Sequence, residues 1–194
     1  MTYQPKILAF AGSLRKDSHN KKLVKIAAKG AEDAGGIVTY IDLKGYPLPL
    51  YDQEIEDATG IPENARKLKE LMLASDGFLI ACPEYNSSMT AVFKNVIDWT
   101  SRMSKPDEVY LCCFIDKVVG LMSASPGGMG GMRGLVHVRS MLGNMFSLVL
   151  PQQKCISQSH QAFDDAGMLK DAKAQADTLN IGRTLVEFLK KHKA

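Results

Sequence analysis

Short apolar runs alternate along this chain with longer segments whose apolar residues recur at helical spacing. Four continuous runs and one alternating run predict strands, at residues 7–11, 37–43, 78–82, 117–123 and 146–150. The other periodic segments predict helices, at residues 21–34, 62–75, 90–100, 132–142 and 172–191. Strands and helices that alternate with short connections favour a parallel sheet covered by helices on both faces.

The number and order of these elements predict the fold. Five strands fit an α/β, doubly wound parallel sheet of the flavodoxin-like type, with strand order 2-1-3-4-5 and helices on both faces. In that order the progression of the chain across the sheet reverses between strands 1 and 3, and ligands of such sheets bind at this switch point. The chain has 194 residues and no internal repeats, so we expect residues 1–194 to form a single domain.

Three polar loops follow predicted strands 1, 3 and 4. We name them the first loop (residues 12–20), the second loop (residues 83–90) and the third loop (residues 125–131). The three strands are neighbours in the predicted sheet, and the carboxyl ends of parallel strands lie at the same edge. We therefore expect the loops to form one ligand site at the switch point.

The first loop carries groups that bind anions. Ser13 and Ser18 offer hydroxyls, Arg15 a planar cation and Asn20 an amide at the start of the next helix, whose free N–H groups also favour negative charge. Three lysines crowd the same helix start: Lys16, Lys21 and Lys22. The alternative is an ordinary helix cap by Ser18 or Asn20, with the lysines in solvent. Neither a GxxxxGK[ST] nor a GxGxxG pattern occurs in the loop, so a single phosphate, as in FMN, fits it best.

The second and third loops suit the flat part of such a ligand. Pro83 stiffens the second loop, Asn86 tolerates turn conformations, and Tyr85 supplies a ring that can cover a heterocycle. The glycines of the third loop, Gly127 and Gly128 among them, allow the backbone to approach a ligand closely. The alternatives are a surface turn with an exposed tyrosine for the second loop and a mobile linker for the third.

Composition excludes several classes of protein. The net charge of +3 is too small for a nucleic-acid-binding surface, and no apolar stretch approaches 18 residues, so we expect no nucleic acid and no membrane as partner. The four cysteines have no metal-ligand spacing and no HExxH pattern occurs, so we expect no metal site. Unpaired cysteines and the absence of signal-peptide features at the N-terminus indicate a cytoplasmic location.

The loop sequences resemble those of the NADPH-dependent FMN reductase family, which includes chromate, quinone and azo-dye reductases. GSLRKDSHN is similar to the family pattern G-S-x-R-x-x-S-x-N, and PEYNSSMTAVFKNVIDW is similar to P-E-Y-N-x-S-x-x-x-x-L-K-N-A-I-D-W. The stretch SPGGMGGMR, which ends at Arg133, is a third match. Phe93 and Val96 depart from the usual leucine and alanine, and both changes fall at positions expected in the core.

The resemblance implies site residues and a reaction. Hydride passes from NADPH (or NADH) to bound FMN, and electrons then pass to a small-molecule acceptor such as a quinone, an azo dye, chromate or free flavin. No side chain is expected to act as a catalytic residue, because the flavin carries the chemistry. Homodimers or homotetramers are common in the family. The implied cofactor-binding residues are Ser13, Arg15, Ser18 and Asn20 for the phosphate, Pro83, Glu84, Tyr85 and Asn86 for the isoalloxazine, and Ser125, Gly127 and Gly128 on its other side.

Two other functions remain open from the sequence. A flavodoxin-type electron carrier would bind FMN without oxidising NAD(P)H itself, although such carriers are usually acidic and this chain is slightly basic, with a sequence pI near 8.6. A flavin-free regulatory protein could use the same fold. A yellow purified protein that NADPH bleaches without a partner would separate the enzyme from both alternatives.

Overall fold

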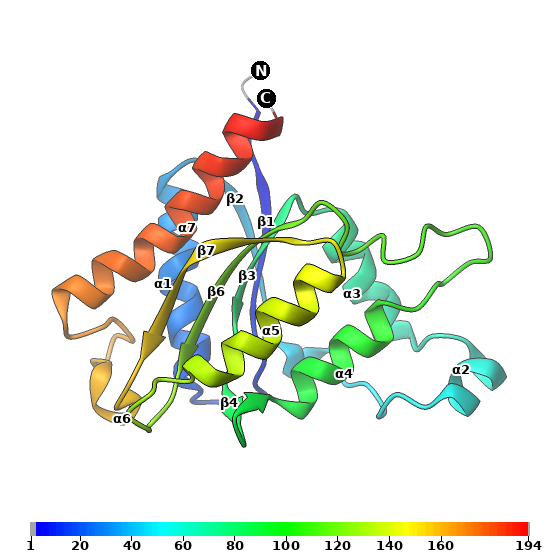
Figure 1. Ribbon diagram of the computed structural model, residues 1–194, viewed down its shortest axis with the longest axis horizontal. Coiled ribbons are helices and arrows are strands. Elements are labelled where there is room, and N and C mark those ends of the chain that lie inside the picture. The colour runs from blue at the N-terminus through cyan, green and yellow to red at the C-terminus, as the bar shows by residue number, and fades with distance from the viewer. Residues whose placement is uncertain (1–2, 194) are drawn as a thin grey trace.

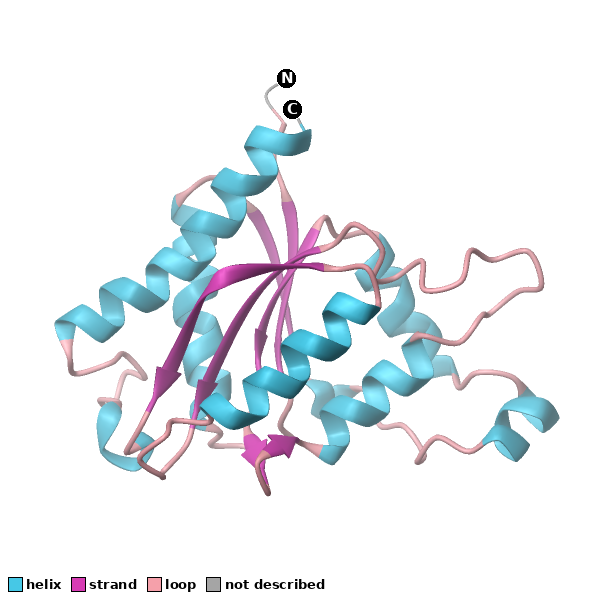
Figure 2. Ribbon diagram, viewed as in Figure 1, coloured by secondary structure: helices cyan, strands magenta, loops and turns pink. Residues whose placement is uncertain are grey.

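Within residues 3–193, which the computed structural model describes, five parallel strands form the central sheet (Figures 1 and 2). The strands are β1 (Lys6–Ala11), β2 (Ile37–Ile41), β3 (Gly77–Ala81), β6 (Val118–Ala124) and β7 (Leu148–Ile156). Their order in the sheet is β2-β1-β3-β6-β7, and every neighbouring pair is parallel. The predicted order 2-1-3-4-5 and the doubly wound fold are therefore confirmed.

Helices cover both faces of the sheet (Figure 1). One face packs against α1 (His19–Asp33) and α7 (Ala172–Lys193), through apolar residues such as Leu23, Ile26 and Leu185. The other face packs against α3 (Glu63–Leu73), α4 (Ala91–Thr100) and α5 (Met132–Asn144), with Phe93 and Val138 fully buried between them and the sheet. The central strands β1, β3 and β6 are almost entirely apolar because both of their faces are buried.

The two outer strands differ from their predicted bounds. β2 ends at Ile41, and not at residue 43, because the Asp42 side chain accepts a hydrogen bond from Lys44 N (3.0 Å) and begins a 3-10 helix, η1 (Leu43–Gly45). β7 runs to Ile156, and not to residue 150. The extension is polar and contains Pro151, which an edge strand tolerates, and its register shifts between Val119 and Leu121 of the neighbouring strand.

Several short elements were not predicted. They are α2 (Gln53–Thr59), which buries no residue, α6 (Ser159–Ala162) and a hairpin of β4 (Glu84–Tyr85) and β5 (Ser88–Met89) inside the second loop. The sequence predicted a stiff polar loop here, and within it the structure has this hairpin. Its central residues Asn86 and Ser87 have left-handed φ values of 50° and 65°, as in a type I′ turn.

The loops that follow the carboxyl ends of the strands lie at one edge of the sheet. In Figure 1 the hairpin and α6 lie at the lower edge, toward which the strand arrows point. The three loops follow β1, β3 and β6, which are adjacent in the sheet, so they meet there as expected. None of the helices in the described part of the chain is long and apolar enough to cross a membrane.

Candidate functional site

The three loops border a pocket of about 80 Å³ at the switch point. It is lined by Ser13, Arg15, Ser18, His19, Asn20, Pro83, Glu84, Tyr85, Ala124, Ser125 and Pro126. All of the predicted site residues except Asn86, Gly127 and Gly128 are in this lining. His19, Ala124 and Pro126 also line the pocket, although the sequence did not indicate them as site residues.

The first loop leads into α1 with donors that face the pocket. Ser13 and Ser18 are buried, whereas Arg15 is exposed. Ser18 has extended backbone at the N-cap position of α1, but its side chain makes no capping hydrogen bond to any described residue. The alternative that Ser18 merely caps the helix is therefore wrong. No side chain in the described part of the chain caps the start of α1, so its first N–H groups are available to an anion.

The Asn20 side chain ties the first loop to the third. Its amide nitrogen donates to the carbonyl of Ala124 (2.8 Å), and its oxygen accepts from Ala124 N (2.9 Å). Asn20 is 3% exposed and Ala124 is 4% exposed, so both bonds are shielded from water. The Asn20 side chain therefore holds the end of β6 in place, and its backbone N–H lies at the helix start.

Two close contacts tie the first loop to the second. The Thr90 hydroxyl donates to the carbonyl of Gly12 (2.7 Å) and also accepts from Phe93 N (3.3 Å), which caps α4. A Cβ at position 12 would lie 2.9 Å from the Cβ of Phe93. Gly12 thus allows the first loop to pack directly on the start of α4.

The lysine cluster at the start of α1 is smaller than expected. Lys21 is buried, and its Nζ lies 2.7 Å from the Asp42 carboxylate, an acid that the sequence did not place near this helix. Burial would raise the pKa of Asp42, but the hydrogen bonds from Lys21 and Lys44 N outweigh it and hold that pKa below its usual value. Lys21 therefore belongs to a structural ion pair and is not a lysine of the pocket mouth.

The hairpin in the second loop is fixed to α5 by Glu84. Its carboxylate accepts from Arg133 (2.7 and 3.0 Å) and from Gly134 N (3.1 Å). Burial would raise the pKa of Glu84, but these hydrogen bonds and the charge of Arg133 lower it overall. Tyr85, the next residue, is 56% exposed, so its ring is free to cover a ligand.

The glycines of the third loop divide into two kinds. Gly131 has a φ of 88°, and a Cβ there would lie 1.9 Å from the Ser123 hydroxyl, so the fold itself requires glycine. A Cβ at position 127 would have one neighbour within 4 Å in the described chain, the Ser125 hydroxyl at 3.7 Å, and a Cβ at position 128 would have none. Packing does not explain these two glycines, and the open space beside them leaves room for a ligand to approach the backbone.

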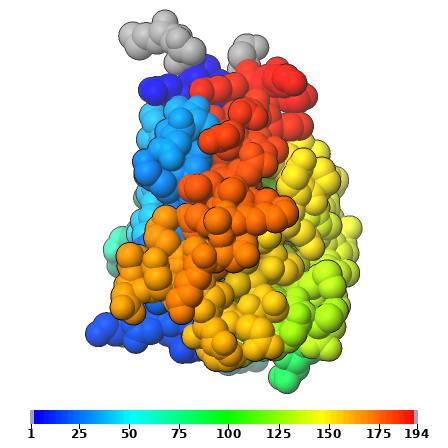
Figure 3. All heavy atoms as spheres, turned by 90° about the vertical axis from the view of Figure 1, so that its left-hand side faces the viewer, coloured from blue at the N-terminus to red at the C-terminus, as the bar shows by residue number. Residues whose placement is uncertain are grey.

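His19 joins the site to a distant part of the chain. Its Nδ1 lies 2.8 Å from the Ser159 hydroxyl, and its ring stacks on Phe163 with centroids 5.7 Å apart. The Ser159 N–H donates to the carbonyl of Ser125 (3.1 Å), so the segment after β7 contacts both the first and the third loop. In Figure 3 this segment, in orange, lies beside blue atoms from the early part of the chain. His19 falls inside the first motif, but no sequence periodicity indicates its distant partners.

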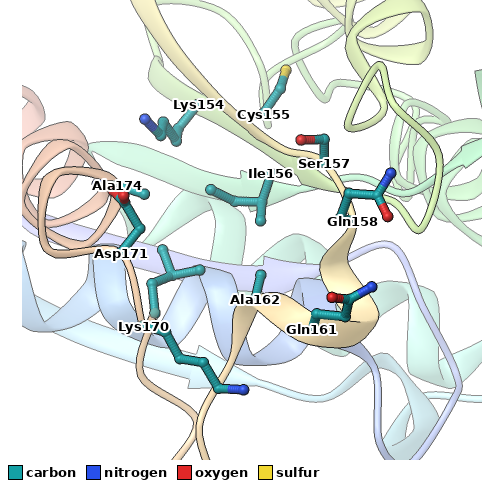
Figure 4. A pocket seen from close by; sticks show the side chains of 11 residues that line it. Lys154, Cys155, Ile156, Ser157, Gln158, Gln161, Ala162, Lys170, Asp171 and Ala174 are labelled. Carbon is teal, nitrogen blue, oxygen red and sulfur yellow. Dashed lines mark hydrogen bonds between the residues drawn. The ribbon is translucent and has the colours of Figure 1, made fainter.

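A second pocket, of about 350 Å³, lies between the end of β7, α6 and the start of α7 (Figure 4). In Figure 4 Cys155 points away from Lys170 and Gln161, so the polar side chains around this pocket do not converge. It contains none of the residues from the three motifs. Among the described residues there is also no group of His, Cys, Asp and Glu that could hold a metal ion.

The smaller pocket has the composition of a mononucleotide flavin site on a flavodoxin-like sheet. Hydroxyls, a guanidinium and a helix start without a side-chain cap suit a phosphate, and an exposed tyrosine with open glycines suits a flat ring. The residues present therefore fit FMN. The profile of the NADPH-dependent FMN reductase family matches residues 5–161, and this chain belongs to that family.

Individual relatives agree with this assignment. An NAD(P)H-dependent FMN reductase of Pseudomonas aeruginosa is 36% identical over 173 residues, which are 88% of this chain and 87% of the relative. A quinone reductase of Escherichia coli is 32% identical over 154 residues, or 77% and 76% of the two chains. The solved structure of FerB, a flavoenzyme NAD(P)H:(acceptor) oxidoreductase from Paracoccus denitrificans, superposes with a TM-score of 0.79 at 27% identity and covers 97% of this chain and 98% of FerB.

The family membership decides between the functions left open by the sequence. The chain is an NAD(P)H-dependent oxidoreductase with FMN as cofactor, and not a flavodoxin-type carrier or a flavin-free protein. Its electron acceptor is a small molecule.

Proposed function

We propose that the pocket at the switch point holds FMN with its phosphate on the first loop and its isoalloxazine between the second and third loops. Ser13, Ser18 and Arg15 would bind the phosphate together with the backbone N–H groups at the start of α1, including that of Asn20. The open helix start carries this proposal, because N–H groups at a helix start without a capping side chain can donate to a bound anion.

The isoalloxazine would lie against Pro83, Glu84, Tyr85 and Asn86 on one side. Because Glu84 is held by Arg133 and Gly134, it offers the flavin its backbone and not a free carboxylate. Ser125, Gly127 and Gly128 would close the other side, where the absence of Cβ atoms leaves space.

When bound, FMN supplies acceptance of a hydride from NAD(P)H and delivery of electrons to the acceptor. This chain's residues position the ring and exclude water, and none of them is proposed as an acid or base. Each of the three loops carries an exposed apolar side chain: Leu14 is 50% exposed, Tyr85 56% and Met129 48%. These side chains favour a flat apolar acceptor, so a quinone is our first choice, ahead of an azo dye, chromate or free flavin.

We further infer a homodimer or homotetramer and a cytoplasmic location for a single domain of residues 1–194. Large exposed apolar side chains that do not line the pocket support association, since Leu50 is 76% exposed, Phe146 66% and Val136 61%. The cysteines in the described part of the chain are unpaired, as in a reducing compartment. Light scattering after gel filtration measures the oligomer, and a monomer at micromolar concentration would refute the association.

Reconstitution tests the function directly. The flavin-free protein should take up one FMN, turn yellow, and lose that colour when NADPH is added without oxygen. A quinone added next should restore the colour at a higher kcat/KM than an azo dye, chromate or free flavin. A protein that binds FMN but is not bleached by NADPH or NADH would contradict the oxidoreductase activity, and a different ranking would contradict only the quinone preference.

A further inference from the structure

His19 is placed at the phosphate end of the pocket but is not one of the residues predicted to bind the phosphate. It is the first residue of α1, and it lines the pocket beside Arg15, Ser18 and Asn20. Nδ1 is engaged by the Ser159 hydroxyl (2.8 Å), and the stacked ring of Phe163 fixes the plane of the imidazole. No described residue forms a hydrogen bond with Nε2, so this nitrogen is available to a ligand.

The surroundings of His19 are electropositive. Arg15 on the first loop, Lys22 on α1 and His160 on α6 act on it, while Phe163, from the segment after α6, contributes no charge. Lys22 is itself held over the Phe163 ring, with Nζ 5.7 Å from the centroid. Glu84 is the carboxylate among the residues that line the pocket, and it is already paired with Arg133. The N-terminal end of α1 adds a further positive partial charge.

Burial and these charges favour the neutral imidazole over the protonated one while the pocket holds no anion. Burial first, then Arg15, Lys22 and His160, lower the pKa of His19 below its ordinary value. A phosphate bound at the start of α1 carries close to two negative charges at neutral pH, and it would reverse the sign of the local field. The His19 imidazole, which disfavours a proton in the absence of an anion, would then favour one.

We propose that His19 is a proton-linked ligand of the FMN phosphate: neutral in the empty pocket, it takes one proton from solvent when the phosphate binds and then donates Nε2–H to a phosphate oxygen. This inference rests on the proposed FMN site. Nδ1–H would donate to Ser159 in the charged state, which fixes the ring for this bond. The proton comes from the buffer, so no other side chain of the protein has to supply it.

The sign of the resulting pH dependence follows from linkage. Because the pKa of His19 is higher in the complex than in the free protein, binding takes up protons and affinity falls as the pH rises between those two values. A shift of one pKa unit corresponds to a tenfold change in FMN affinity across this range. The second ionisation of the phosphate lies near pH 6, so measurements from pH 7.0 to 8.5 avoid it.

Titration calorimetry of the flavin-free protein with FMN, in buffers of different ionisation enthalpy, measures the proton uptake. The wild type should take up a clear fraction of a proton at pH 7.5, and its Kd should rise severalfold from pH 7.0 to 8.5. Riboflavin, which lacks the phosphate, should show neither effect. His19→Gln, which places an amide near the Nε2 position, should bind FMN without proton uptake. His160→Gln is the matched control, since it removes the neighbouring imidazole and should retain the uptake.

The histidine resonances in NMR spectra of the wild type, with and without FMN, give a second measure. The wild-type spectra should contain one imidazole whose pKa rises by at least about one unit with FMN and not with riboflavin. His19→Asn, whose amide can still reach Ser159, assigns that resonance if His19→Gln does not fold. Equal proton uptake for FMN and riboflavin, or uptake that survives the loss of His19, would overturn the inference while the FMN site stands. Failure to bind FMN at all would refute both.

Discussion

Replacing Asn20 by alanine should weaken the fold and the site together. The substitution removes both hydrogen bonds to Ala124 and leaves a buried N–H and a buried carbonyl without partners. Each unsatisfied buried group costs about 1–3 kcal/mol, so the free energy of unfolding should fall by about 3 kcal/mol. This is a large share of the roughly 5–15 kcal/mol that stabilise a typical domain.

Urea unfolding of the flavin-free protein, followed by the fluorescence of the buried Trp99, measures this loss. With an m-value of about 2 kcal/mol per molar, the midpoint should fall by about 1.5 M. Asn144→Ala is the matched control, because Asn144 is exposed at the end of α5 and its loss should cost less than about 0.5 kcal/mol. The affinities for FMN and riboflavin should fall by the same factor in Asn20→Ala. Wild-type stability with a loss confined to FMN would refute this reasoning and make the Asn20 side chain a phosphate ligand.

Three further predictions test other parts of the site. Arg15→Ala should lower the affinity for FMN about tenfold and leave the affinity for riboflavin unchanged, because an exposed guanidinium contributes at the low end of the about 1.5–3 kcal/mol typical of charged hydrogen bonds. Lys16 is also exposed, and Lys16→Ala should change neither affinity. An equal effect of the two variants in calorimetry would contradict a specific contact of Arg15 with the phosphate. Tyr85→Ala should lower kcat for quinone reduction severalfold at an unfolding free energy within about 0.5 kcal/mol of wild type, and unchanged turnover would show the exposed ring to be idle. Because the pKa of Asp42 is lowered in the fold, its pair with Lys21 should stabilise the protein above about pH 4 and lose that effect on further acidification. In urea titrations the free energy of unfolding of Asp42→Asn should therefore depend less on acid pH than that of the wild type. The same pH dependence in both proteins would contradict the pairing.

The central strands could be predicted because burial on both faces leaves a continuous apolar run. Their order could be predicted because alternating strands and helices favour a doubly wound parallel sheet. β3 is buried at every position, as is all of β1 except its first residue. The extension of β7 could not be predicted, because an edge strand is held by backbone hydrogen bonds and accepts polar residues such as Gln152 and Gln153. α2 was missed for a related reason, since it buries no side chain and therefore has no apolar stripe to detect.

The candidate site, like the fold, could be predicted only in part from the sequence. The motifs predicted most of the residues that line the pocket, because loops after adjacent parallel strands must meet. They did not predict what the side chains contact: Asn20 bonds to Ala124, Lys21 pairs with Asp42, and Glu84 pairs with Arg133. These partners are distant in sequence, and their pairing depends on how far each helix lies from the sheet edge. Spacing along the chain carries no information about that distance.

The hairpin of β4 and β5 separates two tasks that a single loop would have to combine. Its base is anchored through Glu84 to α5, while its tip, Asn86 and Ser87, is exposed and forms no part of the central sheet. Ser87 is not among the residues proposed to hold FMN, so mutations there should not loosen the cofactor, provided that the new residue accepts a left-handed φ. Such a layout makes Ser87 the position at which to begin a directed-evolution library for new electron acceptors, because the base of the hairpin stays anchored whatever side chain the tip carries.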